Sequence, residues 1–339
     1  MTTALLVRLS AMGDVVQTLG AVAALHRARP DWRLVFVTQT TFAPLLEGLA
    51  GIAQVVTFAR RGGLRGFFAL RRQLRAMRAD LALDLQGNWK SALVARCSGA
   101  RDVVGIAAAW RQEPASRVLL RRLVHGGGAP HPARLAYEVV RDVAPGARFE
   151  LPRLVATDAE RQREIAALAA IGIDASQPFA VIVGTDPRDP RALRPARVPE
   201  LVAALRVPCV WLLGPAEAAL TPPAGLPTLR HGPGEVRRLI ALGAVVGAVG
   251  GEVVGPDQGA SHVLAAAGAS CRVLFGAQDP LRTAPPSALA LVHPRGPTCR
   301  PCRASLCRHP DGPVCMEFGL ADALPVALGL PDPADARPH

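Results

Sequence analysis

The sequence contains few aromatic side chains and almost no lysine. Only 4% of its 339 residues are Phe, Trp or Tyr, and Lys90 is the single lysine among 39 basic residues. Because half of the chain is apolar, Ala, Val and Leu must build the cores, as they do where helices pack on parallel sheets. Since Ala and Pro are abundant beside Arg, codon bias explains part of the formal charge of +12. We therefore expect an anionic lipid or sugar phosphate as a partner, and no nucleic acid.

Long apolar runs are also lacking. No segment offers the roughly 20 consecutive apolar residues that span a bilayer. The opening segment MTTALLVRLSAMGDVV has no basic stretch before a long apolar run and no small-residue cleavage site, so it is typical of a first strand. We expect a cytoplasmic protein with peripheral membrane contact at most.

The length suits two domains of roughly 150 residues each. In residues 1–150, apolar runs at 5–9, 34–38, 55–58 and 81–85 alternate with amphipathic stretches such as 15–27 and 64–78. This alternation predicts a parallel sheet with helices on both faces, which is a doubly wound, Rossmann-like domain. The Arg-rich stretch 101–148 is expected to be helical and to cover that domain.

Residues 151–330 repeat the alternation after a boundary near 152–157. We expect helices at 159–170, 198–205 and 259–267, with further apolar segments at 179–183, 209–213, 236–242, 244–249 and 272–275. The predicted fold class is α/β, with two Rossmann-like doubly wound domains facing a central cleft. Residues 331–339 lack periodicity and are expected to be a frayed tail.

A carboxylate follows the first predicted strand. Ser10, Gly13 and Asp14 lie between that strand and the next helix, at the sheet edge where doubly wound domains bind ligands. Asp14 suits a helix N-cap. It also suits a general base that takes the proton of an attacking hydroxyl, with Ser10 and Gly13 on the acceptor side.

A second loop, VGPDQGASHV at 254–263, joins a predicted strand to a helix. The N–H groups of such a helix start can hold a diphosphate. The candidates there are Asp257, Gln258, Gly259, Ser261 and His262. The alternative is a capped helix with a histidine that faces the core.

Basic side chains follow several strands of the first domain. Arg60 and Arg61 follow the third apolar run. Lys90 lies just after the segment DLQGNW, and Arg111 follows the next apolar run after that segment. Such a rim suits an acceptor that carries phosphate or carboxylate groups. A solvated charged surface is the alternative.

Taken in order, these segments resemble glycosyltransferase family 9, which includes the lipopolysaccharide heptosyltransferases. VRLSAMGDVVQTLGAVAAL is similar to the family's strand, loop and helix that carry the proposed catalytic aspartate, here Asp14. DLQGNWKSALVAR is similar to an acceptor-side segment. PDQGASHVLAAAGASCRVLFGAQDP is similar to the donor signature Asp-Thr-Gly-x-x-His followed by Phe-Gly-x-x-Asp-Pro.

The resemblance implies a GT-B fold and inverting transfer from ADP-heptose to a Kdo-containing lipopolysaccharide core or related envelope glycolipid. It implies transient contact with the cytoplasmic face of the inner membrane and no cofactor in catalysis. Thr185 and Glu217 match donor-side positions. Two departures stand out: Gln258 replaces the signature threonine, and no lysine follows Thr185, so Arg191 or Arg194 would replace it.

Four cysteines cluster near the C-terminus. Cys299, Cys302, Cys307 and Cys315 include one CxxC pair, a common half-site for structural zinc. The wider spacing of the others is irregular for a zinc ribbon. Disulfide or redox pairing and unligated thiols are the alternatives.

Two other functions share much of this pattern. A sugar-nucleotide epimerase of the same fold would also bind a diphosphate but would need no acceptor. A catalytically weakened family member, altered at Gln258 and in the loop after Thr185, would bind the donor as an accessory protein without transferring the sugar.

Overall fold

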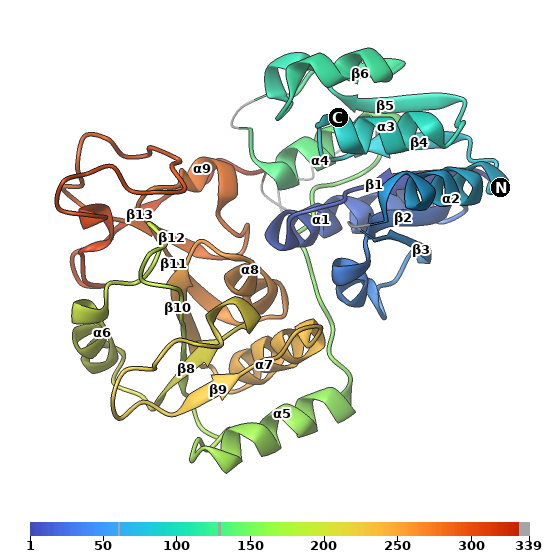
Figure 1. Cartoon of the computed structure of the whole chain (residues 1–339). Helices are drawn as coiled ribbons and strands as arrows, with labels where there is room; N and C mark the ends of the chain where they lie inside the picture. The colour runs from blue at the N-terminus through green and yellow to red at the C-terminus, as the bar shows by residue number, and fades with distance from the viewer. Residues whose placement is uncertain (60–61, 128–129, 332–339) are drawn as a thin grey trace. The chain divides into compact units, whose positions relative to one another are not determined.

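The computed structural model describes residues 1–59, 62–127 and 130–331. The chain divides into two compact units, one formed by Met1–Pro152 with the residues from Gly329 onward and the other by Arg153–Leu328. Each unit contains its own sheet with helices packed beside it (Figure 1). All of the expected tail after Pro331 lies outside the described residues.

The first unit is built on a six-stranded sheet in the order β3-β2-β1-β4-β5-β6, with every strand pair parallel. Its strands are β1 (Thr3–Val7), β2 (Arg33–Gln39), β3 (Ile52–Phe58), β4 (Leu81–Asp84), β5 (Asp102–Ile106) and β6 (Arg122–Val124). Its helices are α1 (Met12–Ala28), α2 (Gly63–Ala76), α3 (Trp89–Cys97) and α4 (Pro132–Val143). Short 3-10 helices cover Thr40–Leu46, Ala108–Trp110 and Pro114–Leu119.

The second unit has a seven-stranded sheet in the order β13-β12-β11-β10-β7-β8-β9. Its strands are β7 (Ala180–Val183), β8 (Cys209–Leu213), β9 (Thr228–Arg230), β10 (Glu252–Pro256), β11 (Ser270–Phe275), β12 (Leu289–Val292) and β13 (Leu324–Val326). Its helices are α5 (Asp158–Ala170), α6 (Val198–Leu205), α7 (Val236–Ala248), α8 (Gly259–Ala266) and α9 (Pro280–Thr283). Short 3-10 helices cover Pro195–Arg197, Pro215–Glu217 and Val314–Met316. Among the strands of the described residues, only the edge strand β13 pairs antiparallel, with β12.

Alternating side chains of the second sheet feed two separate apolar clusters. Val181 and Val183 of β7 belong to one cluster, with Leu242 of α7 and Leu264 of α8. Ile182 of the same strand belongs to the other cluster. Because successive side chains of a strand point to opposite faces, both faces of this sheet are buried, as the continuous apolar runs predict.

Two segments differ from expectation. The stretch 101–148, expected to be helical throughout, contains strands β5 and β6, and its only α-helix among the described residues is α4. The apolar segments 236–242 and 244–249 are not two separate elements, because Val236–Ala248 form the single helix α7.

Both sheets reverse their strand order at one point. In the first unit the chain runs outward from β1 through β2 to β3 and then returns to β4 beside β1. In the second it runs from β7 to β9 and returns to β10 beside β7. Ligands of doubly wound sheets bind at the carboxyl ends of the strands at such switch points, so the β1, β4, β7 and β10 loops are the candidate site loops.

Candidate active site

Asp14 lies in the first turn of α1, directly after β1. The N-cap of this helix is Ala11, so the reading of Asp14 as N-cap is wrong. Instead, Asp14 Oδ2 accepts a hydrogen bond of 3.3 Å from the Ala11 backbone N–H. Its side chain is 26% exposed, which leaves a carboxylate open to solvent at the switch point of the first sheet.

A buried arginine holds this carboxylate. Arg8 Nη2 lies 2.6 Å from Asp14 Oδ2, and the Arg8 side chain is only 3% exposed. Arg8 Nη1 also donates to the Leu85 carbonyl, at 2.7 Å. A buried guanidinium requires a counter-charge, so the ion pair fixes both charge and position at Asp14.

The loop after β4 supports the Asp14 loop. Gln86 Oε1 accepts a hydrogen bond of 2.8 Å from the Leu9 N–H, and its Nε2 donates to Ser10 Oγ at 3.3 Å. Asp84 Oδ1 accepts from the backbone N–H groups of Gln86 and Gly87. The two loops of the switch point are thus joined through Gln86.

Arg111 does not lie on the basic rim that the sequence suggested. Its side chain and that of Asp84 are both completely buried, with Nη2 2.6 Å from Asp84 Oδ2. The remaining nitrogens donate to Ser116 Oγ and to the Ile106 carbonyl. Because its donors are used inside the unit, we assign Arg111 a structural role in place of acceptor binding. Lys90 is exposed in the first turn of α3, whereas Arg60 and Arg61 lie outside the described residues.

The predicted donor residues follow three neighbouring strands. Asp257 follows β10, Thr185 follows β7 and Glu217 follows β8, and β7 pairs with both other strands. Parallel strands place their carboxyl ends at one edge of a sheet. The sheet therefore gathers these three loops at one edge of the second unit.

Asp257 is the centre of a hydrogen-bond network. Its Oδ1 lies 3.2 Å from His262 Nε2, its Oδ2 accepts a bond of 2.7 Å from Thr283 Oγ1, and its carbonyl accepts from Arg191 Nη1 at 3.1 Å. Asp257 and His262 are both buried. The arrangement fixes the start of α8.

The start of α8 is free of a side-chain cap. Gln258 occupies the N-cap position without capping the helix, because its amide Nε2 donates to the Gly184 carbonyl at 3.2 Å. Thr185 Oγ1 is buried and has no hydrogen-bond partner within the described protein. An open helix N-terminus beside an unpaired buried hydroxyl suits a phosphate ligand.

Arg191, and not Arg194, joins this group. Arg191 binds Asp189 through two nitrogens, with Nη2 2.6 Å from Oδ2, and its third nitrogen reaches Asp257. Arg194 lies 3.4 Å from the carboxylate of Glu317. The structure therefore places Arg191, and not Arg194, against the Asp257 loop.

Glu217 adds a carboxylate with unusual chemistry. Burial raises the pKa of its carboxyl above the ordinary value, and the negative charges of Asp186 and Asp189 raise it further, although bonds from backbone N–H groups lower it. A carboxyl of this kind can accept a hydrogen bond from a sugar hydroxyl, or donate one to it when protonated.

Ser261 is committed to the fold. Its hydroxyl donates to the Pro256 carbonyl at 2.8 Å, and the residue is fully buried. Sequence reasoning missed one contributor, Arg8. For Arg8, a charged residue directly after the buried run 4–7 was the available signal.

The four clustered cysteines are not arranged as a metal site. Cys299 and Cys302 are exposed and Cys315 is buried, and all four are free thiols. Within the described residues, no group of three or more His, Cys, Asp or Glu side chains could hold a metal ion. Burial raises the pKa of the Cys315 thiol to about 11, and the nearby Cys302, Cys307 and Cys299 raise it as well. Zinc analysis of purified, unchelated protein tests the structural-zinc hypothesis directly.

Known proteins resemble this chain over part of its sequence and over most of its fold. The profile of "Glycosyltransferase family 9 (heptosyltransferase)" matches residues 67–191. Lipopolysaccharide heptosyltransferase 1 of Pseudomonas aeruginosa is 31% identical over 130 residues. This chain resembles the heptosyltransferases of glycosyltransferase family 9. The alignment with the Pseudomonas protein spans 36% of that protein and 35% of this chain.

Solved structures resemble this chain over most of its length. The family 9 glycosyl transferase of Veillonella parvula has a TM-score of 0.73 at 15% identity and covers 86% of this chain and 85% of its own. E. coli heptosyltransferase WaaC with ADP-2-deoxy-2-fluoro heptose has a TM-score of 0.64 at 22% identity, with 86% and 94% covered. These similarities confirm the predicted fold class, GT-B with two Rossmann-like units.

Proposed function

We propose that this protein is an inverting glycosyltransferase that moves heptose from ADP-heptose to a Kdo-containing lipopolysaccharide core or a related envelope glycolipid. The observation that carries the proposal is the carboxylate of Asp14, partly exposed at the switch point of the first sheet and held by the buried Arg8. The family resemblance and the donor named with WaaC support the choice of sugar nucleotide.

In this reaction Asp14 is the general base. The acceptor hydroxyl attacks the anomeric carbon of the donor while its proton passes to an oxygen of Asp14. The new glycosidic bond forms as the bond to the diphosphate breaks, so the anomeric configuration inverts. ADP leaves with the electron pair of the broken bond.

The second unit holds the donor. N–H groups at the start of α8 and the guanidinium of Arg191 stabilise the negative charge on the departing diphosphate. Thr185 supplies a further hydroxyl, and the carboxyl of Glu217 binds sugar hydroxyls. The helix N–H groups and Arg191 offset the leaving charge without a metal ion, so the proposal includes no cofactor.

Arg191 offers the sharpest test of the donor half. A hydrogen bond to a charged group contributes about 1.5–3 kcal/mol, so Arg191→Ala is expected to weaken ADP binding roughly 10- to 100-fold. Isothermal titration calorimetry with ADP measures the effect. Arg188→Ala is the matched control, because Arg188 pairs with Asp186 in the same loop but is 89% exposed. Equal losses in both variants would contradict the assigned site.

The acceptor and the location of the enzyme are part of the same proposal. An anionic, lipid-linked sugar acceptor brings the protein to the cytoplasmic face of the inner membrane, where the exposed Lys90 and the half-buried Ser10 would meet it. Among the described residues, no helix combines the length and the apolar character needed to cross a bilayer.

The departure at Gln258 keeps a weakened accessory protein as the second candidate. In the family signature a hydroxyl stands at this position, whereas the Gln258 amide here bonds Gly184. Donor binding without any transfer to acceptor would favour this candidate. Turnover of ADP-heptose without acceptor would favour the epimerase.

A further inference from the structure

Helix α2 exposes large apolar side chains on its outer face. Leu70 and Leu74 are buried against the first unit, whereas Leu64 is 76% exposed and Phe68 is 58% exposed. Residues four apart on a helix lie on the same face, so Leu64 and Phe68 form one exposed apolar ridge. Such a ridge on a helix indicates an interaction surface.

The same helix carries charge of one sign only. Its sequence GLRGFFALRRQLRA contains four arginines and no acidic residue. Arg65, Arg72 and Arg75 are exposed, and the spacing of Arg65, Phe68 and Arg72 places them on the same face as the ridge. We call the surface formed by Leu64, Arg65, Phe68, Arg72 and Arg75 the α2 face.

We propose that the α2 face docks on a bilayer containing anionic phospholipids. Interfacial helices place apolar side chains at the boundary of headgroups and acyl chains and keep basic side chains at the phosphates. Arginine suits this arrangement, because its apolar stem packs along the lipid while the guanidinium reaches outward. The short helix therefore lies in the plane of the membrane and does not span it.

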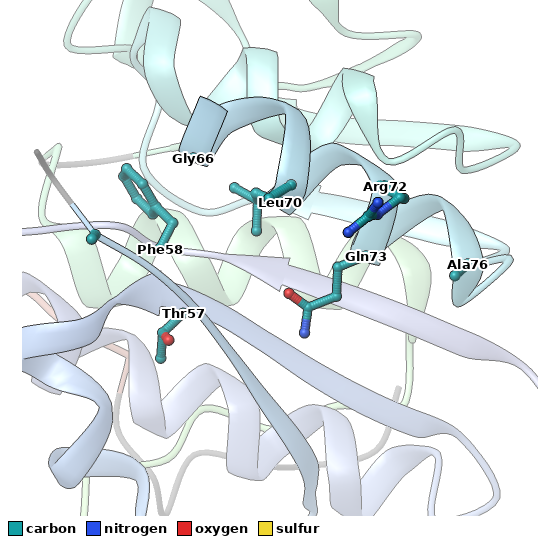
Figure 2. A pocket seen from close by; sticks show the side chains of 9 residues that line it. Thr57, Phe58, Gly66, Leu70, Arg72, Gln73 and Ala76 are labelled. Atoms are coloured by element: carbon teal, nitrogen blue, oxygen red, sulfur yellow. The ribbon is translucent and has the colours of Figure 1, made fainter. Parts of the chain in front are cut away.

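A groove beside α2 has the same mixed character. It has a volume of about 530 Å³ and is lined by β3 and α2, with Phe58, Leu70, Arg72 and Gln73 among its residues. Figure 2 shows Leu70 between Phe58 on one side and the polar side chains of Arg72 and Gln73 on the other. Apolar lining beside a guanidinium fits part of a phospholipid of the same bilayer.

Charge argues against a second copy of the chain as the occupant. A symmetric dimer would bring two α2 faces together and oppose arginines to arginines, which is destabilising. Anionic headgroups provide the complementary charge, and the α2 face contains none of its own. The inference depends on α2 and the adjoining strand β3 and stands whether or not the protein transfers heptose.

Vesicle co-sedimentation with the full chain tests this surface. Wild-type protein is expected to bind phosphatidylcholine vesicles containing phosphatidylglycerol at least about tenfold more tightly than pure phosphatidylcholine vesicles, and less tightly as salt rises. Arg65→Gln with Arg72→Gln removes two of the charges, and Leu64→Ser with Phe68→Ser removes the ridge. Each pair is expected to weaken binding to the anionic vesicles about tenfold or more.

The matched control makes the same chemical changes in the second unit. Leu306 is 72% exposed and Arg163 is exposed, so Leu306→Ser with Arg163→Gln should leave vesicle binding within about twofold. Circular dichroism and ADP binding of each variant show that the units remain folded. Equal effects of control and α2 variants, equal binding to neutral vesicles, or a dimer that the α2 variants dissociate would each overturn the proposal.

Discussion

Asp14→Asn is expected to lower the rate of heptose transfer by about 10²- to 10⁴-fold, the usual contribution of a general base. The amide has nearly the shape of the carboxylate but cannot take the acceptor proton. ADP binding is expected to change little, because the proposed donor groups belong to the other sheet. Steady-state transfer assays and calorimetry with ADP measure the two effects on the same preparation.

The buried Arg8 dictates the control for this experiment. Asp14→Asn removes the counter-charge of a guanidinium that is only 3% exposed, so some loss of stability is expected. Thermal unfolding of the variant, assayed well below its transition, separates a folding defect from a chemical one. Unchanged transfer in a folded variant would exclude Asp14 as the base.

Arg111→Met is expected to be the most destabilising single change in the first unit, by about 3–5 kcal/mol. The substitution leaves Asp84 as an unpaired carboxylate with no exposed surface. Asp84 also orders the backbone at Gln86 and Gly87, so the loop beside Asp14 loosens with it. Urea unfolding followed by circular dichroism measures the loss in the transition of the first unit.

Two comparisons make this prediction specific. Asp102→Asn removes one partner of an exposed pair with Arg122, whose side chains are 37% and 41% exposed, and is expected to cost about 1 kcal/mol or less. The double variant Asp84→Leu with Arg111→Met removes both buried charges and should recover most of the stability. A single Arg111→Met variant as stable as Asp102→Asn would show that the buried pair is not needed.

The sequence predicted a helix or strand wherever that element has a residue pattern of its own. The 3.6-residue pattern predicted α5, α6 and α8 to within a residue or two, because each carries an uninterrupted amphipathic or apolar run. Strands β5 and β6 lie in an Arg-rich segment whose pattern suggested helix, and β6 is only three residues long. Their conformation depends on pairing with β4 and with each other, which the Arg-rich surroundings do not reveal.

Helix α7 was not recognised as one helix, because tertiary packing requires glycines within it. Gly243 and Gly247 interrupt its apolar pattern, and Gly243 separates the two segments that the sequence suggested. In the structure, a Cβ on Gly247 would lie 2.4 Å from the Gly268 carbonyl oxygen, and one on Gly243 would lie 2.8 Å from the Leu264 carbonyl oxygen. The glycines allow α7 to approach α8 and the turn after it, which is a tertiary requirement.

The residues of the candidate site were likewise only partly predictable from the sequence. Loops at the carboxyl ends of strands were predictable from alternation alone. The structure places Thr185 and Asp257 in such loops, and Asp14 in the first turn of the helix that follows one. The role of each arginine was not predictable, because it depends on partners distant in sequence. Arg111 is buried against Asp84, the last residue of β4, and Arg8 contacts Asp14 and the Leu85 carbonyl.

The most direct test of the proposed function is the product of one incubation. Purified protein, ADP-heptose and a Kdo-terminated lipid acceptor are combined, and the product is analysed by mass spectrometry and by NMR of the anomeric proton. The proposal predicts a heptosylated acceptor whose new linkage has the anomeric configuration opposite to that of the donor. Retained configuration, an altered donor without acceptor, or bound donor with no product would contradict it.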